Sequence, residues 1–108
     1  MPVNTGTAAS EQMAPSAPAR ILVVEDEETL LFTLAHNLRH EGYEVLTATR
    51  GDDGLRIARE KRPGLIVLDV MLPGIDGLQV CRLLRRDSPV PIIMLTALGG
   101  ERDRVAGL

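Results

Sequence analysis

The chain has 108 residues, of which 44% are hydrophobic, and its 12 basic and 15 acidic side chains give a formal net charge of -3. This length allows one small domain, and a charge so close to neutral excludes a basic protein that would coat nucleic acid or an anionic membrane unaided. The sequence has no run of about 18 apolar residues, so no membrane-spanning helix is expected. The single cysteine, Cys81, cannot form an internal disulfide, so nothing indicates an oxidising compartment and we expect a cytoplasmic protein.

The first 19 residues differ in composition from the rest of the chain. They contain three prolines, several alanines, serines and threonines, and one charged side chain, Glu11. They lack the positive end and apolar stretch of a secretory signal, and they offer too little apolar surface to offset the entropy of ordering. We therefore expect a flexible leader over 1–19 and one globular domain over 20–108.

Four short segments of the globular part are predicted to be strands. The runs 21–24, 65–68 and 92–95 are apolar without a break, as strands covered on both faces are. The segment 43–48 alternates more and is typical of a strand at the edge of a sheet.

Helical periodicity fills the intervals between these strands. An apolar stripe ending at Gly42 marks the first helix: Leu30, Leu31, Leu34, Ala35 and Leu38. A second helix is predicted over 51–62, a third from Gly77 onward, and the start of a fourth over 101–108. Strict alternation of strand and helix predicts an α/β fold with a parallel sheet and right-handed crossovers.

Polar side chains follow three of the predicted strands. Glu25 and Asp26 come after the first strand, Asp69 after the third, and Thr96 after the fourth. Each has an ordinary explanation taken alone: the acids suit the first turn of a helix or a turn, and the hydroxyl suits a helix cap. In open parallel sheets, however, ligands bind beyond the carboxyl ends of the strands, where these four side chains should meet.

Several carboxylates in one place repel one another unless protons or a cation offset their charge. Oxygen donors without histidine or thiolate favour a hard ion such as Mg²⁺. A carboxylate can also act as a nucleophile toward phosphorus, and Thr96 could donate a hydrogen bond to a phosphoryl oxygen.

Three stretches of the chain carry a family resemblance: ILVVEDEETL, LIVLDVMLPGIDG and PIIMLTA. Together they resemble the receiver domain of bacterial two-component response regulators, in particular the OmpR-like class that drives a winged-helix DNA-binding domain. The resemblance covers 20–108. It implies a flavodoxin-like, doubly wound parallel sheet with strand order 2-1-3-4, followed in the family by a fifth strand.

The resemblance also implies a role for each site residue. Asp69 would be the phosphoacceptor and a Mg²⁺ ligand, with Asp26 binding the ion directly, Glu25 through water, and the backbone carbonyl of Met71 as a further ligand. Thr96 would be the switch hydroxyl. The phosphoryl group would come from a sensor histidine kinase, and the full-length protein could form a homodimer.

One family feature is absent from the sequence. The family uses a lysine at the end of its fifth strand to contact the phosphoryl group, whereas the one lysine here, Lys61, falls at the end of the second predicted helix. The fifth strand and fifth helix would lie beyond Leu108. We therefore expect a C-terminally incomplete receiver, loosely folded and impaired in phosphotransfer, that does not bind DNA by itself.

Three functions remain open at this point. The first is a phosphorylation-dependent signalling module rather than an enzyme. The second is a degenerate receiver that serves only as a docking module. The third is a Mg²⁺-dependent phosphatase, which would need a second acid two residues after its nucleophile, where this chain has Met71.

Two other features are expected to be structural. Cys81 lies on an apolar helical stripe and is predicted to be a core thiol. His36 and His40, four residues apart, lack a third ligand and are predicted to be surface imidazoles.

Overall fold

The structure, a computed structural model, describes residues 19–95. Three predictions lie outside these residues: the leader over 1–19 except for its last residue, the switch hydroxyl Thr96, and the fourth helix over 101–108.

Strands and helices alternate strictly along the described residues. The elements are β1 (Arg20–Val24), α1 (Glu28–His40), β2 (Glu44–Ala48), α2 (Gly51–Lys61), β3 (Leu65–Asp69), α3 (Gly77–Arg85) and β4 (Ile92–Leu95). All four predicted strands and the first three predicted helices are confirmed, with boundaries within two residues of those expected.

The four strands form one parallel sheet in the order β2-β1-β3-β4. This is the strand order that the sequence predicted, and β2 lies at an edge, as its alternating pattern indicated. Within residues 19–95, β4 pairs only with β3 and forms the other edge. Because the strands are parallel, each connection runs back along a face of the sheet to the end where the strands begin. All carboxyl ends of the strands therefore lie at the same rim.

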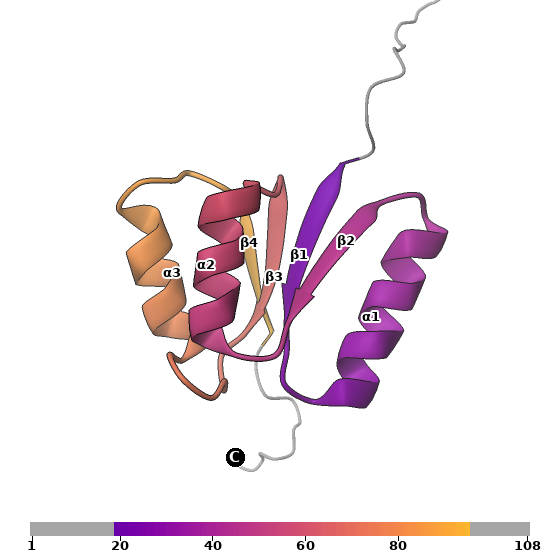
Figure 1. The fold of residues 1–108 in the computed structure, drawn as a ribbon, viewed down its shortest axis with the longest axis horizontal. Coiled ribbons are helices and arrows are strands. Elements are labelled where there is room, and N and C mark those ends of the chain that lie inside the picture. The colour runs from indigo at the N-terminus through magenta and orange to yellow at the C-terminus, as the bar shows by residue number, and fades with distance from the viewer. Residues whose placement is uncertain (1–18, 96–108) are drawn as a thin grey trace, which may run out of the picture.

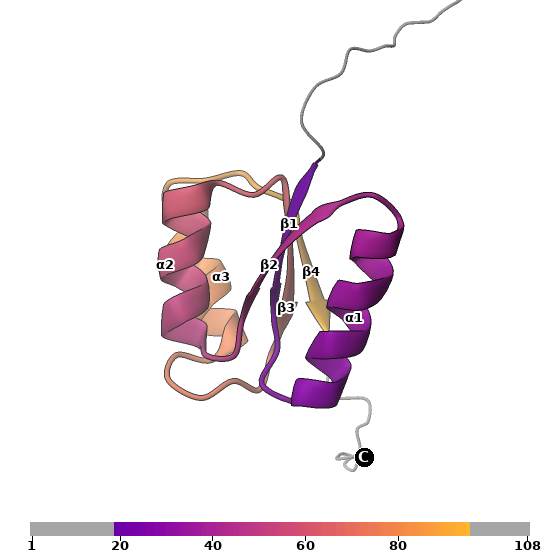
Figure 2. The ribbon, with the colours of Figure 1, turned by 45° about the vertical axis from the view of Figure 1, so that its right-hand side comes forward.

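Helices cover the two faces of the sheet unequally. Figures 1 and 2 show α2 and α3 side by side on one face and α1 alone on the other. Successive side chains of β1 alternate between the faces. Leu22 and Val24 therefore pack under α2 and α3, whereas Ile21 and Val23 pack under α1.

Side-chain caps fix where two helices begin. Glu27 caps α1 by accepting a 2.8 Å hydrogen bond from the backbone N–H of Leu30, and Asp76 caps α3 by accepting one of 2.9 Å from Gln79. Neither cap was predicted from the sequence. Glu25 and Asp26 precede the cap of α1, so the alternative explanation that they belong to its first turn is wrong.

Two packing predictions need correction. Leu30, placed on the buried stripe of α1, is 40% exposed, whereas Leu31, Leu34 and Leu38 pack against the sheet. It is exposed because, among the described residues, no second helix flanks α1. Cys81 is half-buried rather than fully buried, but it packs against the core cluster as predicted. Within residues 19–95, no helix is both long and apolar enough to cross a membrane.

Candidate functional site

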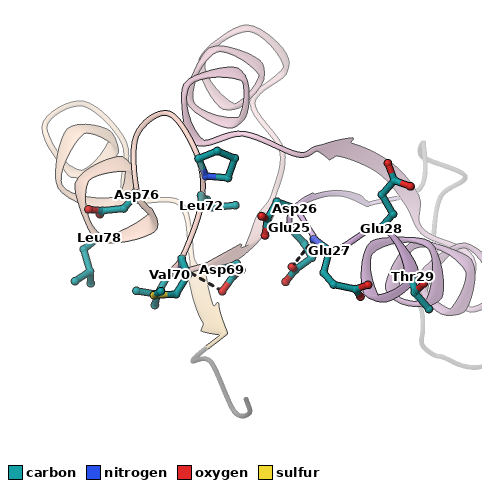
Figure 3. Close-up of a pocket in the computed structure, with 12 residues that line it drawn as sticks. Glu25, Asp26, Glu27, Glu28, Thr29, Asp69, Val70, Leu72, Asp76 and Leu78 are labelled. Atoms are coloured by element: carbon teal, nitrogen blue, oxygen red, sulfur yellow. Dashed lines mark hydrogen bonds between the residues drawn. The ribbon is translucent and has the colours of Figure 1, made fainter. Parts of the chain in front are cut away.

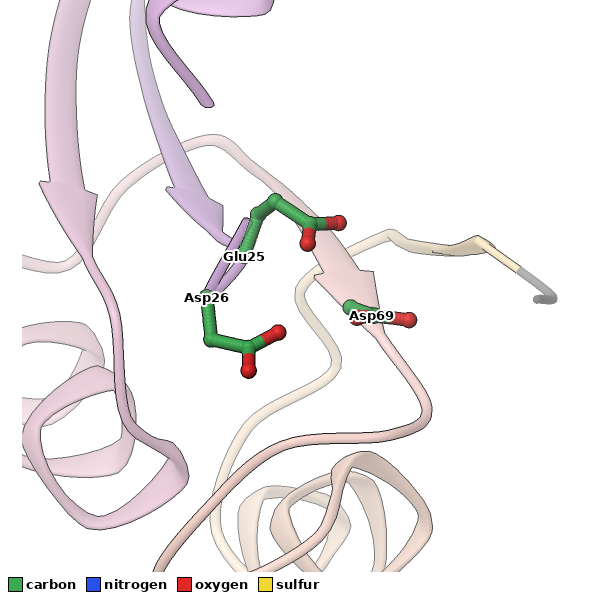
Figure 4. A group of neighbouring side chains, drawn as sticks. All are labelled: Glu25, Asp26 and Asp69. Atoms are coloured by element: carbon green, nitrogen blue, oxygen red, sulfur yellow. The ribbon is translucent and has the colours of Figure 1, made fainter. Parts of the chain in front are cut away.

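The three predicted carboxylates lie together at the rim formed by the carboxyl ends of the strands. Glu25 and Asp26 follow β1 directly, and Asp69 is the last residue of β3 (Figure 4). Strands β1 and β3 are neighbours in register, with Val24 opposite Leu68, so the residues that follow these positions are adjacent across the sheet. A carboxylate oxygen from each of the three residues lies within 4.8 Å of one from each of the others.

The three side chains differ sharply in exposure to solvent. Glu25 is 3% exposed and Asp69 is 7% exposed, and they are the buried charged residues of the described chain. Asp26, by contrast, is exposed at the mouth of the site. A ligand entering from solvent would thus meet Asp26 first and the two buried carboxylates behind it.

Backbone groups hold the two buried carboxylates in place. Glu25 Oε2 accepts a 2.9 Å hydrogen bond from the N–H of Glu27, and Asp69 Oδ1 accepts one of 3.3 Å from the N–H of Met71. The N–H of Glu25 itself donates to the carbonyl of Ala48 at the end of β2, at 3.0 Å. The site is therefore tied to three strands rather than carried by mobile loops.

The surroundings of Glu25 favour its neutral form. Burial raises the pKa of the Glu25 carboxyl above its ordinary value, and the nearby Asp69 and Asp26 carboxylates raise this pKa further. The hydrogen bond from the N–H of Glu27 acts in the opposite direction but does not reverse the shift. This cluster is thus electrostatically unfavourable without a cation or a proton.

The carboxylates line an open cleft of about 950 Å³ between the start of α1 and the loop that joins β3 to α3 (Figure 3). Its other lining residues are Glu27, Glu28, Thr29, Val70, Met71, Leu72, Pro73, Asp76 and Leu78. Met71, whose backbone carbonyl was predicted to be a metal ligand, is among them. The cleft is large enough for a phosphoryl group together with a metal ion and its waters.

Two glycines hold the loop after β3 against the rest of the fold. A Cβ at Gly77 would collide with the backbone carbonyl of Asp69. The N–H of Gly77 donates a hydrogen bond to the carbonyl of Val70 at 2.9 Å. A Cβ at Gly51 would collide with the carbonyl of Ile75. The N–H of Gly51 donates a hydrogen bond to the carbonyl of Pro73 at 3.0 Å. Both glycines were predicted only as helix starts, and their close approach to the backbone was not, since a short backbone contact leaves no periodic signal.

The donor set fits a hard divalent cation. All three side chains offer carboxylate oxygens, and within residues 19–95 no basic side chain forms an ion pair with Glu25 or Asp26. Oxygen donors of this kind suit Mg²⁺, which needs few protein ligands and keeps several waters.

Lys61 does not reach this site, as the sequence analysis predicted. It ends α2, and its carbonyl accepts a 2.9 Å hydrogen bond from Arg20, the first residue of β1. Lys61 therefore lies at the amino ends of the strands, opposite the rim that carries the carboxylates. Of the predicted site residues, the structure brings together Glu25, Asp26, Asp69 and Met71.

Comparisons with known proteins identify the class to which this fold and site belong. Residues 21–108 match the family described as the response regulator receiver domain. The chain belongs to this family, the receiver domains of two-component signalling systems, as the three sequence stretches predicted.

Similar proteins of known name include two bacterial transcriptional regulators of the OmpR class. The chain is 51% identical to the transcriptional regulatory protein AfsQ1 of Streptomyces coelicolor, over 82% of this chain and 39% of that protein. It is 50% identical to the alkaline phosphatase synthesis transcriptional regulatory protein PhoP of Bacillus subtilis, over 82% of this chain and 38% of the relative. The chain thus spans less than two fifths of the length of these relatives.

Solved receiver domains share the fold. The BeF3-activated receiver domain of Klebsiella pneumoniae RstA superposes with a TM-score of 0.70 at 34% identity, covering 80% of this chain and 74% of that one. The receiver domain of a sensor histidine kinase from Pseudomonas aeruginosa superposes with a TM-score of 0.73 at 35% identity, covering 82% and 75%. That structure has a magnesium ion coordinated in its active-site cleft.

Proposed function

We propose that this chain is a phosphorylation-dependent receiver in which Asp69 accepts a phosphoryl group from a sensor histidine kinase. The observation that carries the proposal is the grouping of Glu25, Asp26 and Asp69 within 4.8 Å at one rim of a receiver fold. Asp69 is held by the backbone at the end of β3 and still lines the open cleft, so a phosphodonor can approach it from solvent.

In this proposal, Asp26 and Asp69 bind Mg²⁺ directly, Glu25 binds through water, and the carbonyl of Met71 supplies a further ligand. The bound ion would offset negative charge on the carboxylates and on the incoming phosphoryl oxygens. Exposed Asp26 meets the ion at the mouth of the cleft, whereas buried Glu25 contributes charge from behind. The raised pKa of Glu25 supports this assignment, because it reflects an excess of negative charge that a cation would relieve.

The transfer step forms one bond and breaks another. A carboxylate oxygen of Asp69 attacks phosphorus, the new P–O bond forms, and the P–N bond to the kinase imidazole breaks. The electron pair of that bond leaves with the imidazole nitrogen. Thr96, the residue after β4, would then donate a hydrogen bond to a phosphoryl oxygen and so report the modified state.

The wider role is also a proposal. The named relatives are transcriptional regulators, so the full-length protein would pass the signal to a DNA-binding output domain. A cytoplasmic location and a homodimer of the full-length protein stay predictions from the sequence and the family resemblance. The 108-residue chain is not expected to bind DNA by itself, since its net charge of -3 provides no overall attraction to the phosphate backbone.

Phosphorylation of the chain by a small donor tests the proposal directly. The chain is incubated with Mg²⁺ and acetyl phosphate, and its intact mass is measured. We expect one added phosphoryl group in a fraction of the wild-type chains, because transfer is impaired when Lys61, the one lysine of the sequence, does not reach the site. We expect none in Asp69→Asn, and none when EDTA replaces Mg²⁺. A phosphoryl group that persists in Asp69→Asn would show that another residue is the acceptor.

The alternative function, a docking module without phosphotransfer, makes a different prediction in the same experiment. A docking module would bind Mg²⁺ or a partner but gain no mass under any of these conditions. The phosphatase alternative gains no support from the structure, because Met71 stands where a proton-donating acid is needed and its side chain is 63% exposed.

The raised pKa of Glu25 predicts how Mg²⁺ binding depends on pH. In the metal-free chain, neutral Glu25 is favoured by folding, so this contribution to stability is present at acid pH and is lost as pH rises through the raised pKa. Mg²⁺ requires the ionised form, so the Mg²⁺-induced rise in Tm should shrink as pH falls through the raised pKa of Glu25.

The control for this titration is Glu25→Gln, which keeps the size of the side chain but removes its titration. This variant should lose much of the pH dependence of the Mg²⁺-induced rise in Tm. An unchanged pH profile in Glu25→Gln would assign the dependence to another group.

A further inference from the structure

The outer surface of α1 carries both histidines of the sequence. His36 and His40 are exposed, and four residues of helix place them on one face, one turn apart. Their ring centroids are 6.4 Å apart, with the rings tilted by 31°. Figure 2 shows α1 alone on its side of the sheet, so the described part of the chain contains no helix that could cover this surface.

Neither imidazole takes part in the packing or hydrogen bonding of the fold. Within residues 19–95, both rings lack hydrogen bonds and ion pairs, and their contacts are with aromatic rings on the same helix. Phe32, which is 71% exposed, stacks on His36 with a centroid distance of 6.0 Å and an interplanar angle of 16°. This stack orients the ring of His36. The two nitrogens of each imidazole have no hydrogen-bond partner within residues 19–95.

The position of the pair on α1 also favours a cation. His40 is the last residue of the helix, where the helix dipole gives the carboxyl-terminal end a partial negative charge. Glu28, which begins the same helix, lines the carboxylate cleft at the other end. The helix therefore keeps the histidine pair apart from the carboxylate cluster.

We propose that His36 and His40 together bind a divalent transition-metal ion of borderline softness, such as Ni²⁺, Cu²⁺ or Zn²⁺. Imidazole nitrogens are suitable ligands for these ions, and histidines at positions i and i+4 of a helix form one half of known metal sites. A Zn–N bond is about 2.0–2.1 Å, so the two exposed rings must turn a nitrogen each toward the other to hold one ion between them. Water fills the remaining positions, which makes the site open and exchangeable.

Nuclear magnetic resonance of the imidazole protons tests this site with Ni²⁺ as the probe. The chain has two histidines, so each imidazole signal reports on a single residue. Excess Mg²⁺ is present throughout to occupy the carboxylate cluster. We expect both imidazole signals to broaden together as Ni²⁺ is added, and His36→Ala or His40→Ala to weaken Ni²⁺ binding about tenfold or more, because the second ligand acts at high effective concentration.

A variant that only moves one histidine is the matched control. His36→Thr combined with Thr33→His preserves composition and the helix face but separates the two imidazoles by seven residues, roughly 10.5 Å along the axis. This variant should bind Ni²⁺ as weakly as the single alanine variants. The proposal is wrong if the moved pair keeps wild-type affinity, or if Ni²⁺ leaves the two imidazole signals of the wild type unchanged.

Discussion

Leu22→Ala is expected to lower the free energy of unfolding by about 2–5 kcal/mol, the largest loss of stability predicted for a single substitution in this chain. Leu22 is 0% exposed and lies in the middle of β1, which pairs with β2 on one side and β3 on the other. The strand is fixed on both sides, so the backbone cannot move into the cavity that the lost side-chain atoms leave. A small domain has only about 5–15 kcal/mol of total stability, so this variant should be close to unfolding.

Urea denaturation followed by circular dichroism measures this loss. Leu30→Ala is the matched control, because it makes the same chemical change at a side chain that is 40% exposed on α1. It should change stability by about 0.5 kcal/mol or less, as exposed substitutions usually do. Equal losses in the two variants would contradict the core assignment of Leu22.

Gly77→Ala is expected to cost about 1–3 kcal/mol and to weaken Mg²⁺ binding as well. The new Cβ would meet the carbonyl oxygen of Asp69 and lie 2.9 Å from the Cα of Val70. These are backbone atoms, which cannot rotate away as a flexible side chain can. Either the start of α3 or the end of β3 must move, and movement of β3 displaces the Asp69 carboxylate from Glu25 and Asp26.

The direction of the stability change in Gly77→Ala distinguishes the backbone collision from the effect of helix propensity. Gly77 is the first residue of α3, and alanine is favoured over glycine in a helix by about 1 kcal/mol. Without the collision, Gly77→Ala should therefore stabilise the chain, so a raised Tm would refute the close approach. Gly64→Ala is the control, since its Cβ would lie 3.8 Å from the carbonyl oxygen of Arg20, an ordinary contact.

Helix boundaries show how far local sequence signals reach. Gly42 was predicted to end the first helix, and the structure gives it a φ of 100°, the left-handed conformation that glycine adopts without strain. The residue that caps the start of the same helix was not predicted, because the four residues 25–28 are all acidic. The cap is Glu27, decided by which carboxylate meets a free backbone N–H.

The candidate site shows a similar division between the sequence and the structure. The positions of Glu25, Asp26 and Asp69 after apolar runs were enough to predict that they share one rim, because parallel strands end on the same side. The sequence could not tell that Glu25 is buried and Asp26 exposed. That difference follows from the packing of β1 between two neighbours, and it is what raises the pKa of Glu25.

The sequence by itself determined the alternation of strands and helices, the edge position of β2 and the identity of the acidic residues, because periodicity and residue type are local properties of the chain. Only the tertiary structure decided which carboxylate is desolvated, that Gly77 packs against the peptide of Asp69, and that the rings of His36 and His40 share an uncovered face. These features depend on contacts between segments distant in the sequence, or on what a neighbouring element leaves uncovered.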